Sequence, residues 1–349
     1  MCSADTASQP ESIMARYDQF AIDPSRVLRQ AARTRAPDIS VVLPTYNRQV
    51  ELREAIGSVL ALDEVDFELI VVDDGSTDDT TAELARLDDA RLTVIRLPKS
   101  SGANAARNIG IANARSPCIA FLDSDDIYFP GRLLQPLSIL RENPNVGIVL
   151  SSFTTEKRSK RTRLAVPQRL YTSHELLQLM ARHVLPPTTS GLTVRKDVLE
   201  SIGGFDPALK RMQDRDLVMR AAPHTMGASI ADVLWHKRWQ EDGISTPQAT
   251  YISALTALVE RHPIYQDEEL EFRDYLVARH LVALAMAMKF AQFHRDYSLA
   301  RKRLSPSLPP LPRLFTSYVS SRRHRRRLQK HVLSGNALAG IENAGSQAR

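Results

Sequence analysis

Apolar positions in the first part of the chain follow two repeating patterns, which predict alternating strands and helices. Nearly continuous apolar runs at Ile39–Leu43 and Phe67–Val72 have the character of buried strands. Between them, residues 50–62 place apolar side chains three and four positions apart, which is typical of a helix. Together these segments predict a strand-helix-strand unit.

The alternation continues as far as residue 150 and predicts the fold class. Helices are expected at 78–87, 103–114 and 131–141, and strands at 92–95, 118–122 and 146–150. Strands that are apolar along their whole length are typical of a sheet that helices cover on both faces. We therefore predict an α/β fold with a doubly wound, mainly parallel sheet and helices on both faces.

The pattern changes after residue 150. Residues 153–170 are rich in Lys and Arg and have little periodicity, so we expect a mobile hairpin or loop. Thr172 and Glu175 have the spacing of a capping box, at the start of a helix that ends near His183. The remaining elements are a strand near 190–194 and helices at about 214–222, 251–261 and 268–297.

The change to long helices near residue 248 divides the chain into four parts. They are a lead-in segment at 1–37, an α/β domain at 38–248, a helical extension at 249–300 and a basic tail at 301–349. Within the tail, residues 313–333 combine apolar side chains at helical offsets with a dense cationic block. We expect either an interfacial helix that binds an anionic membrane surface or a solvated, partly disordered end.

Composition narrows the class of protein. Of the 349 residues, 43% are hydrophobic and 25% are charged, as in an ordinary soluble globular protein. The two cysteines, Cys2 and Cys118, cannot build a disulfide framework or a zinc site, which fits a reducing cytoplasm. The first 37 residues hold no apolar signal region, and Leu281–Met288 is far shorter than the about 20 residues that cross a bilayer. We expect a cytoplasmic protein, soluble or peripheral at the inner face of the membrane.

Three carboxylates follow the strand predicted at 118–122. Asp123, Asp125 and Asp126 lie so close in sequence that they would repel one another unless a cation lies between them. One or two carboxylates, completed by water and substrate phosphates, are how proteins usually hold Mg²⁺ or Mn²⁺. The alternative is an Asp that forms a turn or caps a helix, and it stays open for Asp126.

Polar clusters also follow two other predicted strands, at Thr45–Arg48 and Asp73–Ser76. In open α/β sheets ligands bind beyond the carboxyl ends of the strands, so these clusters should meet Asp123–Asp126 at one crevice. The sequence holds no Walker pattern, no G-x-G-x-x-G and no H-E-x-x-H, which argues against an NTPase, a dinucleotide dehydrogenase and a zinc protease. We expect a phosphate-and-metal site in which the metal neutralises most of the phosphate charge.

Four segments resemble, in order and spacing, the family 2 glycosyltransferases of GT-A fold. They are Val-Leu-Pro-Thr-Tyr-Asn at 42–47, Val-Val-Asp-Asp-Gly-Ser-Thr-Asp at 71–78, the stretch 102–110, and Phe-Leu-Asp-Ser-Asp-Asp at 121–126. The resemblance covers about residues 38–245. It implies an inverting transfer of a sugar from a nucleotide-sugar, most often a UDP-sugar, to a hydroxyl acceptor. It also implies Mg²⁺ or Mn²⁺ as cofactor, and a role in polysaccharide or lipid-linked glycan assembly.

The resemblance assigns the nucleotide pocket to residues after the first two strands. Pro44, Thr45 and Asn47 would line it, and Asp73 would contact the base or the ribose. Asp74 would cap and shape the turn.

Further along the chain, the resemblance implies that Arg107 reaches the nucleotide, although a surface helix residue is the alternative. Asp123 and Asp125 correspond to the D-x-D pair of the family. Asp125 would be the direct metal ligand, and Asp123 would bridge to ribose or to metal-bound water.

The segment Met212–Leu217 resembles the E-D-x-D-L segment of the family, which makes Asp214 the catalytic base. A base is needed because the acceptor hydroxyl must lose its proton as its oxygen attacks. Gln213 replaces the usual Glu, which keeps hydrogen bonding but loses a charge. We expect Asp216 to orient Arg220, four residues later on the same helix.

The segment Trp235–Trp239 resembles the one that closes over the donor diphosphate. Lys237 or Arg238 would neutralise phosphate oxygens there. His236 is either a further metal ligand or a packing residue, and the sequence leaves both open.

Two other functions compete with this interpretation. A haloacid-dehalogenase-like phosphatase or phosphotransferase would use Asp123 as nucleophile and Asp125 as acid, but it leaves Asp73–Ser76 unexplained. Non-enzymatic nucleic-acid binding would rest on the basic tail alone, and aromatic residues make up only 6% of the chain. We therefore expect no nucleic-acid partner. The sequence does not name the sugar, the acceptor or the linkage.

Overall fold

The computed structural model describes residues 27–30, 35–157, 160–238, 250–266, 270–304 and 308–333. Some predictions lie wholly or partly outside these residues. They include those for the lead-in segment, Trp239, the domain change near residue 248, and the end of the basic tail.

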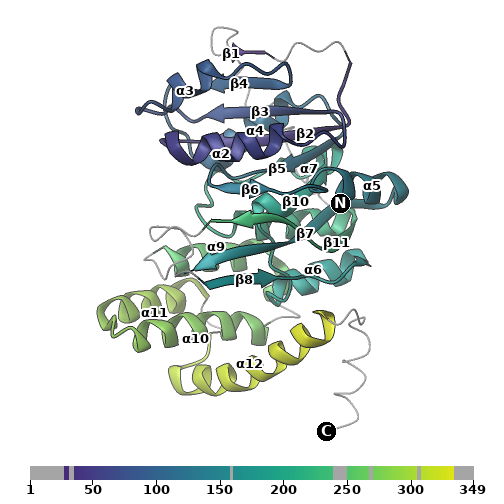
Figure 1. Cartoon of the computed structure of the whole chain (residues 1–349). Coiled ribbons are helices and arrows are strands. Elements are labelled where there is room, and N and C mark those ends of the chain that lie inside the picture. The colour runs from purple at the N-terminus through teal and green to yellow at the C-terminus, as the bar shows by residue number, and fades with distance from the viewer. Residues whose placement is uncertain are drawn as a thin grey trace, which may run out of the picture.

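A mixed sheet runs through the centre of the described molecule (Figure 1). Its strands, in sheet order, are β1 (Val27–Arg29), β4 (Leu92–Arg96), β3 (Phe67–Asp73), β2 (Ile39–Thr45), β5 (Cys118–Phe121), β10 (Leu192–Arg195), β7 (Val146–Lys157), β11 (Met226–Lys237) and β6 (Asp126–Tyr128), with β8 (Lys160–Leu164) beside β7 and β9 (Arg169–Tyr171) beside β11. Strands β4, β3, β2 and β5 are parallel to one another, as are β7 and β11. The other pairings, including both of β10, are antiparallel.

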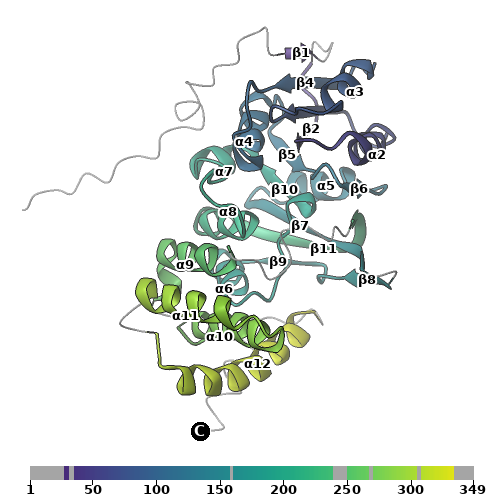
Figure 2. The same cartoon turned by 90° about the vertical axis from the view of Figure 1, so that its left-hand side faces the viewer.

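Helices cover both faces of the sheet, which confirms the predicted α/β class. On one face lie α2 (Gln49–Leu60), α3 (Thr80–Arg86) and α5 (Leu134–Glu142), and on the other lie α4 (Ala103–Asn113), α6 (Ser173–Ala181), α7 (Lys196–Ser201) and α8 (Gln213–Ala221) (Figure 2). Alternate residues of a strand point to opposite faces. Val41 and Leu43 of β2 therefore join the core under α2, whereas Val42 joins the core under α4.

The C-terminal helices pack against the second of these cores. They are α9 (Tyr251–Arg261), α10 (Leu270–Met286), α11 (Phe290–Leu304) and α12 (Leu311–Leu333). Short 3₁₀ turns lie at Thr189–Gly191, Ala222–His224 and Pro263–Tyr265. Leu255, Leu276 and Leu328 belong to the same buried cluster as Leu179 and Leu217. The sheet and the helical extension therefore share one continuous core.

Three differences from the predicted elements have physical reasons. The single helix expected at 268–297 is two helices, because the chain turns at Met288, whose φ of 55° is left-handed. Strand β7 continues past the expected end at residue 150 to Lys157 and pairs with β8, so part of the basic stretch forms the hairpin that was one of its two expected forms. Strand β11 was missed because polar residues such as Ser229 interrupt its apolar pattern, and they are buried with partners, here Tyr171 at 2.8 Å. The predicted capping box of Thr172 and Glu175 is present.

Helix α12 buries its apolar side against the protein and exposes its basic side. Leu314, Leu328 and Val332 are fully buried, while a row of basic residues is exposed: Arg322, Arg323, Arg326, Arg327 and Lys330. Residues 311–333 contain no Asp or Glu. The exposed face of α12 is therefore a cationic stripe, the name we keep for those five residues. No helix among the described residues is long and apolar enough to span a membrane.

Candidate functional site

A cavity of about 610 Å³ lies beyond the carboxyl ends of β2, β3 and β5. Pro44 and Thr45 come from the end of β2, Asp74 follows β3, and Asp123 and Asp125 follow β5. The three polar clusters that the sequence placed at one crevice therefore do meet. The opposite wall is formed by Pro207, Leu209, Lys210 and Gln213.

Thr45 lines this cavity and holds an unpaired polar atom. The residue is almost completely buried, and its Oγ1 has no hydrogen-bond partner in the described structure. A buried hydroxyl without a partner costs free energy, and this oxygen has almost no surface open to the cavity. Asn47 does not line the cavity. Its side-chain oxygen accepts a hydrogen bond from the Thr77 main-chain N–H at 2.8 Å, which ties the turn after β2 to the turn after β3.

The two aspartates after β3 lie differently with respect to the cavity. Asp73 is fully buried, does not line the cavity, and accepts hydrogen bonds from the Ser76 N–H at 2.9 Å and the Thr81 hydroxyl at 2.7 Å. Its carboxylate therefore shapes the turn, and its contact with a base or ribose stays a prediction. Asp74 lines the cavity and accepts from the main-chain N–H groups of Ser101 and Gly102, both at 2.8 Å.

Arg107 lies on the cavity wall and is only 4% exposed, which excludes the alternative of a surface helix residue. Its guanidinium donates to Asn104 Oδ1 at 2.8 Å and to Asp123 Oδ1 at 2.7 Å. The Phe205 ring lies 5.3 Å from the guanidinium carbon. A buried cation is stable in such a place because it is paired and hydrogen-bonded.

Asp126 has a structural role. It is buried in β6, and its Oδ2 accepts from the Ser190 hydroxyl at 2.6 Å, while Ser190 Oγ accepts from the Asp123 main-chain N–H at 3.0 Å. Burial raises the pKa of Asp126 well above its usual value. Asp126 therefore fixes the end of β5, and it caps no helix.

Of the three carboxylates that follow β5, Asp123 and Asp125 line the cavity. Burial, and next the negative charge of Asp123, raise the pKa of Asp125. No group of three or more His, Cys, Asp or Glu side chains that could hold a metal occurs in the described part of the chain, and His236 instead lies 3.0 Å from the Thr154 hydroxyl. The pair fits Mg²⁺ or Mn²⁺ only if water and a diphosphate complete the coordination.

Lys237 provides positive charge beside these carboxylates. Burial alone would lower its pKa, but the charges of Asp126, Asp123 and Asp125 raise it overall. Arg238 forms an ion pair with Glu54, and its main-chain N–H lies 3.3 Å from Asp126 Oδ1. Lys237 is thus the nearer candidate for a phosphate partner.

Asp214 lies in the first turn of α8, half-buried, with Oδ1 accepting from the Arg215 main-chain N–H at 2.8 Å. Burial raises its pKa. Its neighbour Gln213 lines the cavity, whereas Asp214 itself does not. The catalytic assignment of Asp214 stays a prediction.

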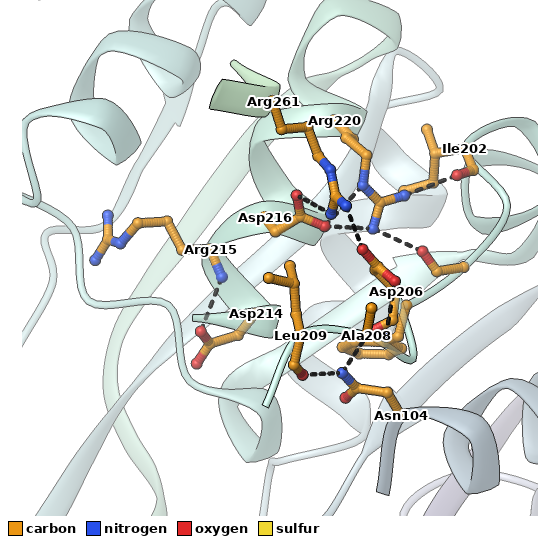
Figure 3. A network of polar contacts seen from close by, with 12 residues as sticks. Asn104, Ile202, Asp206, Ala208, Leu209, Asp214, Arg215, Asp216, Arg220 and Arg261 are labelled. Carbon is orange, nitrogen blue, oxygen red and sulfur yellow. Dashed lines mark hydrogen bonds and ion pairs between the residues drawn. The ribbon is translucent and has the colours of Figure 1, made fainter. Parts of the chain in front are cut away.

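Asp216, on the opposite side of α8, forms the ion pair with Arg220 that the sequence predicted, at 2.8 Å (Figure 3). Burial would raise the pKa of Asp216, but hydrogen bonds from His262 and Arg220 and the nearby cations lower it to about 2. Asp216 is therefore a structural carboxylate.

Comparison with known proteins matches part of the chain to a sequence family. The family described as Glycosyl transferase family 2 matches residues 40–203. An uncharacterised glycosyltransferase of Nostoc is 33% identical over 180 residues, which is 50% of this chain and 56% of that protein. The succinoglycan biosynthesis protein ExoU of Rhizobium meliloti is 43% identical over 103 residues, 29% of this chain and 30% of that protein. The chain thus spans little more than half of the length of the Nostoc protein and less than a third of the length of ExoU.

Solved structures show the same fold. S. aureus TarS 1–349 in complex with UDP-GlcNAc has a TM-score of 0.60 and 17% identity, covering 86% of this chain and 93% of that one. The mannosyltransferase PcManGT from Pyrobaculum calidifontis, in complex with GDP-Man and Mn²⁺, has a TM-score of 0.53 and 18% identity, with 89% and 92% covered. The segments missed from sequence, β11 and the wall at 207–213, had little apolar periodicity to reveal them.

Proposed function

Since residues 40–203 belong to glycosyltransferase family 2, we propose that this protein is an inverting glycosyltransferase that moves a sugar from a nucleotide-sugar to a hydroxyl acceptor. The observation that carries the proposal is the meeting of Thr45, Asp74, Arg107 and Asp125 at one cavity. The family match favours this proposal over the phosphatase alternative.

The donor is proposed to be a UDP-sugar. Asp74 can accept a hydrogen bond from an imide N–H or a ribose hydroxyl, and Thr45 lines the same cavity. TarS in its complex holds UDP-GlcNAc, which supports the choice, whereas PcManGT holds GDP-Man. A GDP-sugar is therefore the alternative that a donor screen must include.

Asp123 and Asp125 are proposed to hold Mg²⁺ or Mn²⁺. A metal there supplies charge that stabilises a departing diphosphate. Arg107 keeps Asp123 in place through the 2.7 Å ion pair, and Lys237 adds a cation on the diphosphate side.

Asp214 is proposed to take the proton of the acceptor hydroxyl. A base works best when its pKa lies near the operating pH, and burial moves the pKa of Asp214 in that direction. Gln213, the neighbour of Asp214, lines the cavity and offers a neutral hydrogen-bonding group to the acceptor. The α/β domain at 38–248 would thus contain the whole catalytic site.

The acceptor is proposed to be a growing polysaccharide or lipid-linked glycan, since succinoglycan biosynthesis proteins are among the relatives. We propose a cytoplasmic protein that binds an anionic membrane surface through α12. Because its apolar side is buried in the protein, the attraction would be electrostatic, through the cationic stripe, and not by insertion.

The proposed function is tested by a panel of UDP- and GDP-sugars, with hydrolysis and thermal stabilisation measured in Mn²⁺ and in excess chelator. A donor at about one hundred times its Kd should stabilise the fold by about 2.7 kcal/mol. Neither hydrolysis nor stabilisation by any member of the panel would contradict the proposal.

A further inference from the structure

The segment from Asp206 to Asp216 carries much of the proposed site. Pro207, Leu209 and Gln213 line the cavity, and Asp214 lies between Gln213 and the end of the segment. A segment that positions both a donor wall and a base must be held at a defined place, because small displacements at a reacting centre are costly.

One side chain from outside the α/β domain contacts both ends of this segment. Arg261, the last residue of α9, forms ion pairs with the Asp206 carboxylate and, at 3.2 Å, with Asp216 Oδ1 (Figure 3). Asp216 is completely buried, and Asp206 is 20% exposed. Arg261 itself is 36% exposed, so the contact is partly shielded from water, chiefly on the side of the carboxylates.

Polar contacts continue from Asp206 to the cavity. Asn104 Nδ2 donates to the main-chain oxygens of Asp206 and Leu209, both at 2.8 Å, and Asn104 Oδ1 accepts from Arg107. Arg107 in turn pairs with Asp123. A continuous series of contacts thus links α9 to the D-x-D pair.

We propose that Arg261 is a positioning residue that couples the C-terminal helices to the donor site, an inference that rests on the proposed function. The planar guanidinium contacts two carboxylates at once, which the point charge of a lysine does not reproduce. Arg220 donates hydrogen bonds to the main-chain oxygens of Ile202 and Gly204, which precede the segment. Among the described residues, Arg261 is therefore the one whose side chain joins Asp206 directly to Asp216.

The chain offers a matched control beside Arg261 on the same helix. Glu260 pairs with Arg303 of α11, Nε to Oε1 at 2.8 Å, and neither residue lines the cavity. Arg303→Gln therefore removes an ion pair that α9 makes with α11, without touching the segment 206–216.

The experiment compares Arg261→Gln, Arg261→Lys, Asp206→Asn and Arg303→Gln with the wild type. Calorimetry with UDP and GDP in Mn²⁺ gives nucleotide affinity, donor hydrolysis gives KM and kcat, and hydrogen exchange reports on the main chain at 205–211. We expect Arg261→Gln to weaken nucleotide binding and raise donor KM by about tenfold, with faster exchange at 205–211. Arg261→Lys should recover little of this, and Asp206→Asn should behave like Arg261→Gln.

The double variant Arg261→Gln with Asp206→Asn should be no worse than either single variant, because both remove the same contact. Wild-type affinity and exchange in Arg261→Gln, or equal losses in Arg303→Gln, would overturn the inference alone. Failure of the wild type to bind UDP or GDP would overturn the proposed function, and the inference with it.

Discussion

Buried carboxylates have different electrostatic environments near the cavity and in the ion-pair network around Arg261, which contains Asp206, Asp216 and Arg220. Burial raises the pKa of Asp125, which lines the cavity, and of Asp214, the neighbour of the cavity residue Gln213. In the network, Arg220 and His262 hold the pKa of Asp216 at about 2 although it is completely buried. For these three carboxylates, the difference shows that cationic partners decide the direction of the pKa shift, and burial alone does not.

The largest effect should follow loss of the carboxylate at the proposed metal site. Asp125→Ala should reduce transfer below detection and weaken binding of a nucleoside diphosphate in Mn²⁺, because a bound metal contributes several kcal/mol to the charge balance of the departing group. Transfer assays and calorimetry measure both quantities. Full activity in this variant, or of the wild type in excess chelator, would contradict the metal-dependent site.

Removal of the proposed base should be the next largest effect. Asp214→Asn should lower kcat by about 10² to 10⁴, the usual range for general base catalysis, with little change in donor affinity. Steady-state kinetics with a varied donor separate the two. If donor binding is lost while kcat is kept, Asp214 is a binding residue.

The basic residues of the cationic stripe are exposed cations, in contrast to the buried carboxylates. Replacing Arg322, Arg326 and Lys330 by Gln should weaken binding to anionic vesicles at low salt by about 100-fold, at about 1 kcal/mol for each basic residue. A matched control replaces Lys289, Arg295 and Arg301, which are exposed on or just before α11. Equal sedimentation of both triple variants would show that α12 is not the membrane contact.

Because the pKa of Asp216 is lowered in the folded protein, stability should decrease as the pH falls. The pKa of Asp216 falls from 3.8 to about 2 on folding, so its contribution is complete above pH 3.8 and is lost as pH falls toward 2. The contribution is about 2 kcal/mol. Urea unfolding between pH 5 and pH 2 should show this loss of stability. The variant Asp216→Asn should lack the pH-dependent part. The control Asp38→Asn, which removes the exposed ion pair with Arg141, should retain it.

The smallest effect concerns the stability of the ligand-free protein. Because the pKa of Asp214 is raised, its charged form opposes folding at neutral pH, and Asp214→Asn should increase the free energy of unfolding. Destabilisation by this variant in urea would mean that the carboxylate has a structural partner, as Asp216 does.

Much of the fold followed from apolar periodicity, because buried strands and amphipathic helices have patterns that depend on local sequence. Strand β11 escaped because its buried polar residues are satisfied by distant ones, as Ser229 is by Tyr171. The aspartates after β3 show the same limit at the site. Only the path of the turn decides that Asp74 faces the cavity and Asp73 does not, and no local pattern encodes that path.

The order of strands in the sheet also has a consequence for synthesis of the chain. Strands β2, β3, β4 and β5 form a parallel block whose β5 edge pairs with β10, and β10 begins only at Leu192. At about 5–20 residues per second, translation leaves that edge without its partner for roughly 4–15 s. An unpaired strand edge is a template for pairing between chains. Nascent chains of this protein should therefore aggregate most readily when translation stops between β5 and β10, and protection by chaperones should matter most in that interval.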